Sequence, residues 1–154
     1  MKVLFIYPDF TLDIDPVTKR FQGLETGGWY MEGLACMSAV LKDKGQDVVL
    51  YHILRPAYPH SFTRRLQKEQ PDLVGFTAGT RSFPFVKEYA RWVKDTLDAP
   101  IICGGYHPDS FPEEVAAVPE IDVVSLGEGE ETMEELCERL AAGEPYLDLA
   151  GAWV

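Results

Sequence analysis

Cysteine is scarce in this chain, with three residues among 154. Cys36, Cys103 and Cys137 stand far apart, and no two of them have the spacing of metal ligands or of a redox pair. This spacing argues against a disulfide framework and against a cysteine-rich zinc site. We expect all three residues to be buried thiols in a reducing compartment, which would place the protein in the cytoplasm.

Long apolar runs and an excess of basic residues are also missing. The apolar start of the chain ends at Pro8, with no small-residue cleavage site behind it, and no later run is long enough to span a bilayer. Lysine and arginine number 14 against 25 acidic residues, which gives a net charge of −11. Nucleic-acid binding needs a basic surface, and an anionic membrane repels an acidic one. We therefore expect neither nucleic acid nor a membrane as a partner.

The chain does have a regular alternation of apolar strands and amphipathic helices. The predicted strands are 2–7, 47–53, 72–76, 99–103 and 121–126. Nearly continuous apolar strands separated by helices are typical of a parallel sheet that is covered on both faces. We predict an α/β fold: a flavodoxin-like (Rossmann-like), doubly wound, five-stranded parallel sheet in the order 2-1-3-4-5, with helices on both faces.

In a sheet of this kind the carboxyl ends of the strands form the ligand crevice. Four loops should meet there, at 8–28, 77–82, 104–110 and 127–130. The third begins with Gly104 and Gly105, which allow a ligand to approach the main chain closely. Ser110 and Glu113 have the spacing of a capping box and predict a helix that begins after Ser110. The first loop is long for a compact domain, so it is either functional or a partly disordered surface loop.

Most nucleotide ligands fit this edge poorly. The first strand is followed by Pro8 and Asp9 and not by the glycine-rich turn of a dinucleotide site, and the chain has no P-loop. The phosphate of flavin mononucleotide would want amide donors after the first strand, where this chain offers a proline and an acid. Glycines, hydroxyls and carboxylates instead suit a large ligand rich in amides and hydroxyls. A corrinoid is such a ligand.

Four segments carry a resemblance to a known family. They are VLFIYP at 3–8, PDLVGFT at 71–77, GGYHP at 104–108 and GEGEET at 127–132. Together and in this order, they resemble the cobalamin-binding domain of cobalamin-dependent radical SAM enzymes. The resemblance covers almost the whole chain, although no single motif is specific. An alternative is a flavodoxin-like binding or interaction domain with another ligand or with no cofactor.

The resemblance implies where cobalamin would lie. Gly104 and Gly105 would line its nucleotide tail, the loop from Thr77 would bound the tail and the lower corrin face, and the loop after Pro8 would cover the ring. The turn at 127–129 would close the slot. The candidate cofactor-binding residues are Pro8, Asp9, Thr77, Ala78, Gly79, Thr80, Gly104, Gly105, Tyr106, His107, Gly127, Glu128 and Gly129.

In this family a separate C-terminal domain carries a [4Fe-4S] cluster on a Cys-x-x-x-Cys-x-x-Cys motif and binds S-adenosylmethionine. That motif is absent here. We therefore expect residues 1–145 to form the cobalamin-binding domain and residues 146–154 to begin the linker to a radical SAM domain. By itself the domain should bind and not catalyse, while the parent enzyme would be a methyltransferase or a related enzyme.

The loop after the first strand has no histidine, whereas many other cobalamin-binding domains place a cobalt-ligating histidine there. Our hypothesis is that the benzimidazole is displaced from cobalt and that no histidine replaces it. His107 is the nearest substitute by sequence, but we expect it to make hydrogen bonds within its loop. We expect surface roles for His52 and His60.

Overall fold

The computed structural model describes residues 1–9, 12–14, 21–23 and 31–154. A sheet of six strands organises the chain, in the order β4-β1-β5-β6-β7-β8. Its strands are β1 (Lys2–Pro8), β4 (Asp47–Ile53), β5 (Leu73–Thr77), β6 (Ile101–Gly104), β7 (Val123–Ser125) and β8 (Ala152–Trp153). The first five are parallel and follow the predicted order, which confirms the flavodoxin-like fold.

The sixth strand corrects the prediction of five. Strand β8 pairs with β7 in the antiparallel direction, Val124 opposite Trp153 and Ser125 opposite Ala152. Two residues are too few to produce a readable strand pattern in the sequence. A separate pair of antiparallel strands, β2 (Leu12–Ile14) and β3 (Phe21–Gly23), occurs within the predicted loop 8–28. Most of that loop lies outside the described residues.

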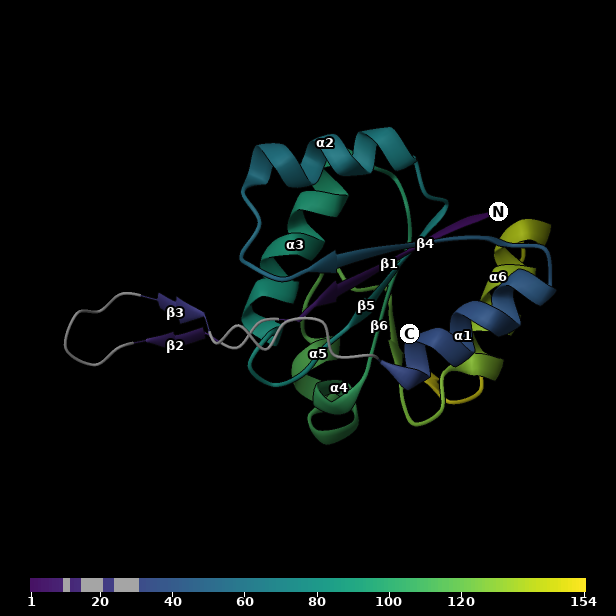
Figure 1. The fold of residues 1–154 in the computed structure, drawn as a ribbon. Helices are drawn as coiled ribbons and strands as arrows, with labels where there is room; N and C mark the ends of the chain where they lie inside the picture. Colours follow the sequence, from purple (N-terminus) through teal and green to yellow (C-terminus); the bar gives the residue numbers. More distant parts are fainter. Residues whose placement is uncertain (10–11, 15–20, 24–30) are drawn as a thin grey trace.

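Helices cover both faces of the sheet (Figure 1). On one face lie α1 (Glu32–Asp43) and α6 (Glu130–Ala142). On the other lie α2 (Pro59–Glu69) and α3 (Phe83–Thr96), together with the short helices α4 (Tyr106–Ser110) and α5 (Pro112–Ala116). The alternation of side chains along a strand decides which layer each residue joins. In β1, Leu4 and Ile6 pack on the α2 and α3 side, while Val3 and Phe5 pack on the α1 and α6 side.

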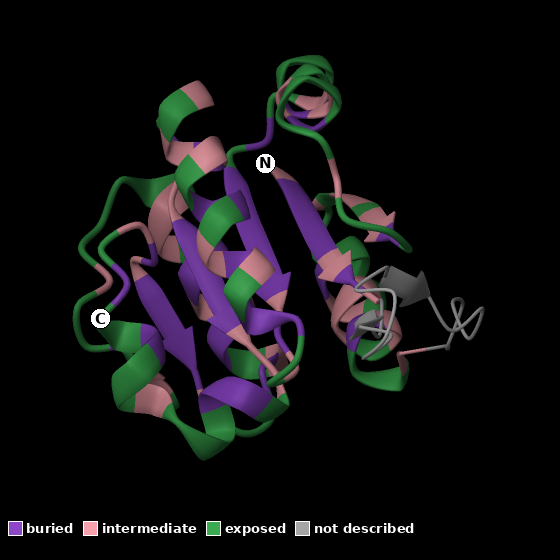
Figure 2. Ribbon diagram, turned by 90° about the vertical axis from the view of Figure 1, so that its left-hand side faces the viewer, coloured by how far each residue is buried: buried purple, intermediate pink, exposed green. Residues whose placement is uncertain are grey.

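The centre of the sheet is therefore buried on both faces, as Figure 2 shows by the purple of its strands. This burial explains the continuous apolar runs in β1 and β5. Because β5, β6 and β7 are neighbouring parallel strands, the loops at their carboxyl ends lie together at one edge of the sheet. No helix in the described part of the chain is long and apolar enough to cross a membrane.

Candidate functional site

A narrow cavity of about 50 Å³ lies at the carboxyl ends of β5, β6 and β7. We call it the glycine slot, because glycines supply much of its wall. Its lining residues are Phe5, Met37, Gly75, Phe76, Thr77, Ile102, Gly104, Gly105, Ser125, Gly127, Gly129 and Met133. Five of the predicted site residues thus surround one cavity: Thr77, Gly104, Gly105, Gly127 and Gly129.

Gly105 has a backbone conformation that favours glycine, with φ at +104°. A Cβ atom there would lie 3.0 Å from the carbonyl oxygen of Ala78 and 3.2 Å from its nitrogen. The two loops are that close because Ala78 N–H donates to Gly104 O at 2.8 Å and His107 N–H donates to Ala78 O at 3.0 Å. Gly105 therefore allows the β5 and β6 loops to meet along their backbones.

Gly104 and Gly129 border the slot on the side of β7. A Cβ on Gly104 would lie 3.4 Å from Ser125 Cβ, and a Cβ on Gly129 would lie 2.9 Å from Met37 Cε. Ser125 is buried and contributes a polar side chain to this wall. Sequence reasoning missed Ser125, which ends the last parallel strand. Its position at a strand end beside the Gly127 turn is the signal that could have found it.

The turn after β7 is fixed from the side of α4. Gly127 has φ at +67°, and its N–H donates to Asp109 Oδ1 at 2.7 Å. Asp109 was not among the predicted residues, although it stands in the loop that follows Gly105. Glu128, which was predicted, is exposed and does not line the slot. The carboxylate of Asp109 thus holds the turn that closes the slot.

The loop after β5 curls into the start of α3. Gly79 N–H donates to Ser82 Oγ at 3.1 Å, and Phe83 N–H donates to Gly79 O at 3.0 Å. Ala78 is buried beneath Gly105, Gly79 is half-buried and Thr80 is exposed. Of this predicted group, only Thr77 lines the slot, while Ala78 shapes it through its backbone.

His107 points its ring into an aromatic cluster. The residue is only 3% exposed. The centre of its ring lies 4.2 Å from that of Phe83 and 5.3 Å from that of Phe111. Nδ1 is 3.4 Å from Thr80 Oγ1, while Nε2 is 3.6 Å from Glu114 Oε2 and makes no hydrogen bond. His107 is therefore a packed side chain next to the slot and does not line it.

Burial lowers the pKa of His107 below its ordinary value, and Lys87 adds to this effect while Glu114 opposes it. An unfolded chain therefore binds the proton more readily than the folded one. The stability that comes from keeping the ring neutral is complete above a pH of about 6.5 and is lost as the pH falls below that value.

The wild-type unfolding free energy should fall between about pH 7.5 and about pH 5.5, and we expect this fall to be smaller in His107→Gln. Urea unfolding at the two pH values measures this difference, with His60→Gln as the control because His60 is an exposed histidine on α2. If the fall in unfolding free energy is the same in His107→Gln as in the wild type, protonation of His107 does not contribute to the pH dependence of stability.

The predicted capping box at Ser110 and Glu113 is wrong. The chain is already helical from Tyr106, and Ser110 ends α4 with its hydroxyl donating to Tyr106 O at 2.8 Å. The residue that precedes α5 is Phe111, which makes no side-chain cap. A serine hydroxyl within a helix commonly bonds the carbonyl four residues back, and this local bond replaced the cap. Tyr106 itself is 77% exposed at the loop surface.

The end of β1 carries a second polar group. Pro8 is buried, and Asp9 Oδ2 lies 2.9 Å from His52 Nε2 on the neighbouring strand β4. Tyr7 stacks on His52 with ring centres 5.1 Å apart. Burial, and to a smaller extent the Asp9 carboxylate, raises the pKa of Tyr7 to about 12. His52 was expected only to have a surface role. The pairing of β1 with β4, Tyr7 opposite His52, creates this contact.

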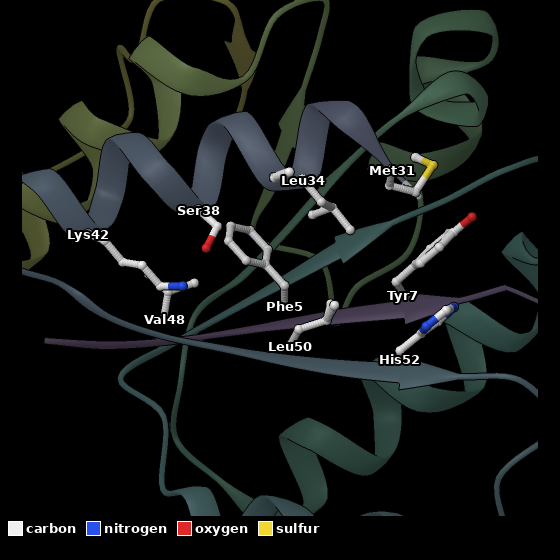
Figure 3. Close-up of a pocket in the computed structure, with 10 residues that line it drawn as sticks. Phe5, Tyr7, Met31, Leu34, Ser38, Lys42, Val48, Leu50 and His52 are labelled. Atoms are coloured by element: carbon white, nitrogen blue, oxygen red, sulfur yellow. The ribbon is translucent and has the colours of Figure 1, made fainter. Parts of the chain in front are cut away.

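Tyr7 and His52 also line a larger hollow between α1 and the strands β1 and β4 (Figure 3). It measures about 420 Å³ and is mostly apolar, with Leu34, Val48 and Leu50 among its lining residues. It contains none of the glycines of the slot. The predicted cover for the corrin ring, the loop after Pro8, lies mainly outside the described residues.

The cysteines and acidic residues form no metal site in the described residues. Cys103 and Cys137 are buried as predicted, and burial raises the pKa of their thiols to about 12 and about 11. Cys36 is exposed on α1, so the expectation of three buried thiols is wrong for this residue. It falls on the outer face of α1, away from the buried Leu34 and Leu41.

Comparison with known proteins identifies the family to which this fold belongs. The family model of the B12 binding domain matches residues 27–137, and the chain belongs to this family. A protein of Pyrococcus horikoshii named as an uncharacterized methyltransferase is 27% identical over 153 residues. That match covers 98% of this chain and 32% of the relative.

Two solved structures share the fold. The radical S-adenosylmethionine methyltransferase TsrM from Kitasatospora setae superposes with a TM-score of 0.77 at 18% identity, over 98% of this chain and 28% of TsrM. The cobalamin-dependent S-adenosylmethionine radical enzyme OxsB gives a TM-score of 0.70 at 18% identity, over 98% of this chain and 20% of OxsB. The chain therefore spans less than a third of each of these proteins.

Proposed function

We propose that this chain is the cobalamin-binding domain of a cobalamin-dependent radical SAM enzyme, of a methyltransferase or cyclase type. The glycine slot would receive the nucleotide tail, and the corrin ring would lie across the carboxyl edge of the sheet. The observation that carries the proposal is the backbone contact at Gly105, where a side chain would collide with Ala78. TsrM and OxsB, which share the fold, are by name radical S-adenosylmethionine enzymes.

The residues at the edge fit such a ligand. The slot combines apolar walls with the side chains of Thr77 and Ser125, the mixture that an aromatic base joined to a ribose requires, and its volume of about 50 Å³ would have to widen to take that group. Asp9, paired with His52, places a carboxylate at the end of β1 on the same edge of the sheet. Tyr106, next to Gly105 in the chain, offers an exposed ring.

The chain offers no well-placed histidine for cobalt. His107 is packed among aromatic rings, His52 is engaged by Asp9, and His60 is exposed on α2. We therefore infer that cobalamin binds with its benzimidazole displaced into the slot and with no histidine in its place. When bound, cobalamin supplies a cobalt centre that can carry a methyl group. The residues of this chain would bind and orient it.

A radical SAM domain in the same parent protein would supply the [4Fe-4S] cluster and S-adenosylmethionine. This part of the proposal is supported by the small share of TsrM and OxsB that the chain spans. The substrate would then be recognised mainly outside this chain. Residues 146–154 would connect the two domains.

The test is direct binding. Purified protein is mixed with hydroxocobalamin, free cofactor is removed by gel filtration, and the visible spectrum of the protein peak is recorded, with flavin mononucleotide in a parallel sample. We expect about one cobalamin per chain, with the bands of the form that lacks both benzimidazole and histidine, and no bound flavin. A colourless peak from protein that circular dichroism shows to be folded would contradict the proposal. Bound flavin would favour the flavodoxin-like alternative.

A further inference from the structure

The C-terminal tail, residues 144–154, packs on the domain it was expected to leave. Leu149 is only 5% exposed and belongs to the core cluster that contains Met133 and Leu136 of α6. Arg139 of α6 donates to Pro145 O at 3.0 Å and also pairs with Asp148. The tail then ends in β8 beside β7. It is therefore joined to the domain by core packing, an ion pair and sheet hydrogen bonds.

The tail also holds both ends of the turn that closes the glycine slot. Leu126 N–H, just before Gly127, donates to Gly151 O at 2.9 Å. Thr132 Oγ1, just after the turn, donates to Ala150 O at 2.9 Å. Two neighbouring tail carbonyls thus hold Leu126, immediately before the segment 127–129, and Thr132, in the first turn of α6 that follows it. Thr132 is buried but does not line the slot itself.

Gly151 has the geometry that this contact requires. Its φ is +71°, and a Cβ atom there would lie 3.1 Å from Thr132 Oγ1. A side chain would therefore be strained and would also push against the threonine. On its other side, the turn is held by the bond from Gly127 to Asp109. The turn is braced between α4 and the tail.

We propose that the tail positions the 127–129 turn for the cofactor, with Thr132 as the positioning residue, so that the affinity for cobalamin depends on the tail. This inference rests on the proposed function. It adds to the predicted role of 146–154 as the start of a linker, since the same residues would also complete the slot. Because binding couplings are reciprocal, cobalamin should in turn stabilise the tail.

The test compares three variants of the whole chain. Thr132→Val removes the hydroxyl, Thr132→Ser keeps it, and Thr96→Val removes a comparable hydroxyl that bonds Trp92 O at 2.7 Å in the last turn of α3. Titration with hydroxocobalamin, followed by visible absorbance, gives the dissociation constant of each variant under conditions where circular dichroism shows it folded. We expect about three- to tenfold weaker binding for Thr132→Val, the loss typical of one hydrogen bond. Thr132→Ser and Thr96→Val should bind like the wild type.

A second readout separates positioning from general stability. Amide hydrogen exchange of residues 149–153 should slow when cobalamin binds to the wild type, and this slowing should be weaker in Thr132→Val. If the wild type binds cobalamin, but Thr132→Val binds equally well and the tail exchange does not respond to cobalamin, the inference is overturned while the proposed function stands. If the wild type fails to bind, the proposed function fails and this inference falls with it.

Discussion

Replacing Gly105 by alanine should abolish most cobalamin binding and destabilise the domain. The φ of +104° favours glycine, and the new methyl group would lie 3.0 Å from a backbone oxygen that cannot move away easily. Holding a non-glycine residue in such a region costs on the order of 1–3 kcal/mol. Relief of this strain would separate the β5 and β6 loops, so we expect at least a roughly tenfold rise in the dissociation constant.

Gly45→Ala is the matched control for this experiment. Gly45 also has a positive φ, +80°, but a Cβ there would meet nothing within 4 Å, and the residue follows the end of α1. Both variants should lose stability in urea unfolding, whereas only Gly105→Ala should lose cobalamin in the titration. Equal affinities for the two variants would mean that the contact between Gly105 and Ala78 is not part of the site.

Replacing His107 by alanine should lower the unfolding free energy by about 3 kcal/mol while leaving the spectrum of bound cobalt unchanged. The ring fills space between Phe83 and Phe111, so its removal leaves a cavity in a packed cluster. A domain of ordinary stability, about 5–15 kcal/mol, remains folded after such a loss.

The control for His107→Ala is His60→Ala, which removes an exposed ring from α2. Substitution at such a surface position should change the unfolding free energy by about 0.5 kcal/mol or less. A shift in the cobalt spectrum of His107→Ala would contradict the account, because it would place this histidine on the metal.

The sheet was predictable because its strands are buried on both faces and therefore appear in the sequence as apolar runs. The short elements were not. Helix α4 contains Pro108, which the first turn of a helix tolerates, so the proline did not exclude it. The spacing of Ser110 and Glu113 predicted the helix after Ser110, which is α5, but gave no sign of α4 before it. Strand β8 depends on its pairing with β7 and has little local signal of its own.

The glycines of the candidate site could be predicted for a similar reason. Gly104 and Gly105 directly follow a buried strand, and this position assigns them to the carboxyl edge. The polar residues around them depend on contacts between distant parts of the chain. Asp9 meets His52 across a strand pair, and Gly127 meets Asp109 across two loops. Neither contact follows from local spacing, so His52 and Asp109 emerged only from the structure.

The central claim is that the glycine slot holds the nucleotide tail of cobalamin. Cobinamide has the same corrin ring without that tail, so a comparison of the two dissociation constants measures the contribution of the slot. Burial of an aromatic base and its ribose should make cobalamin bind at least about 100-fold more tightly than cobinamide. Equal affinities would contradict the account, since the tail would then gain nothing from the protein.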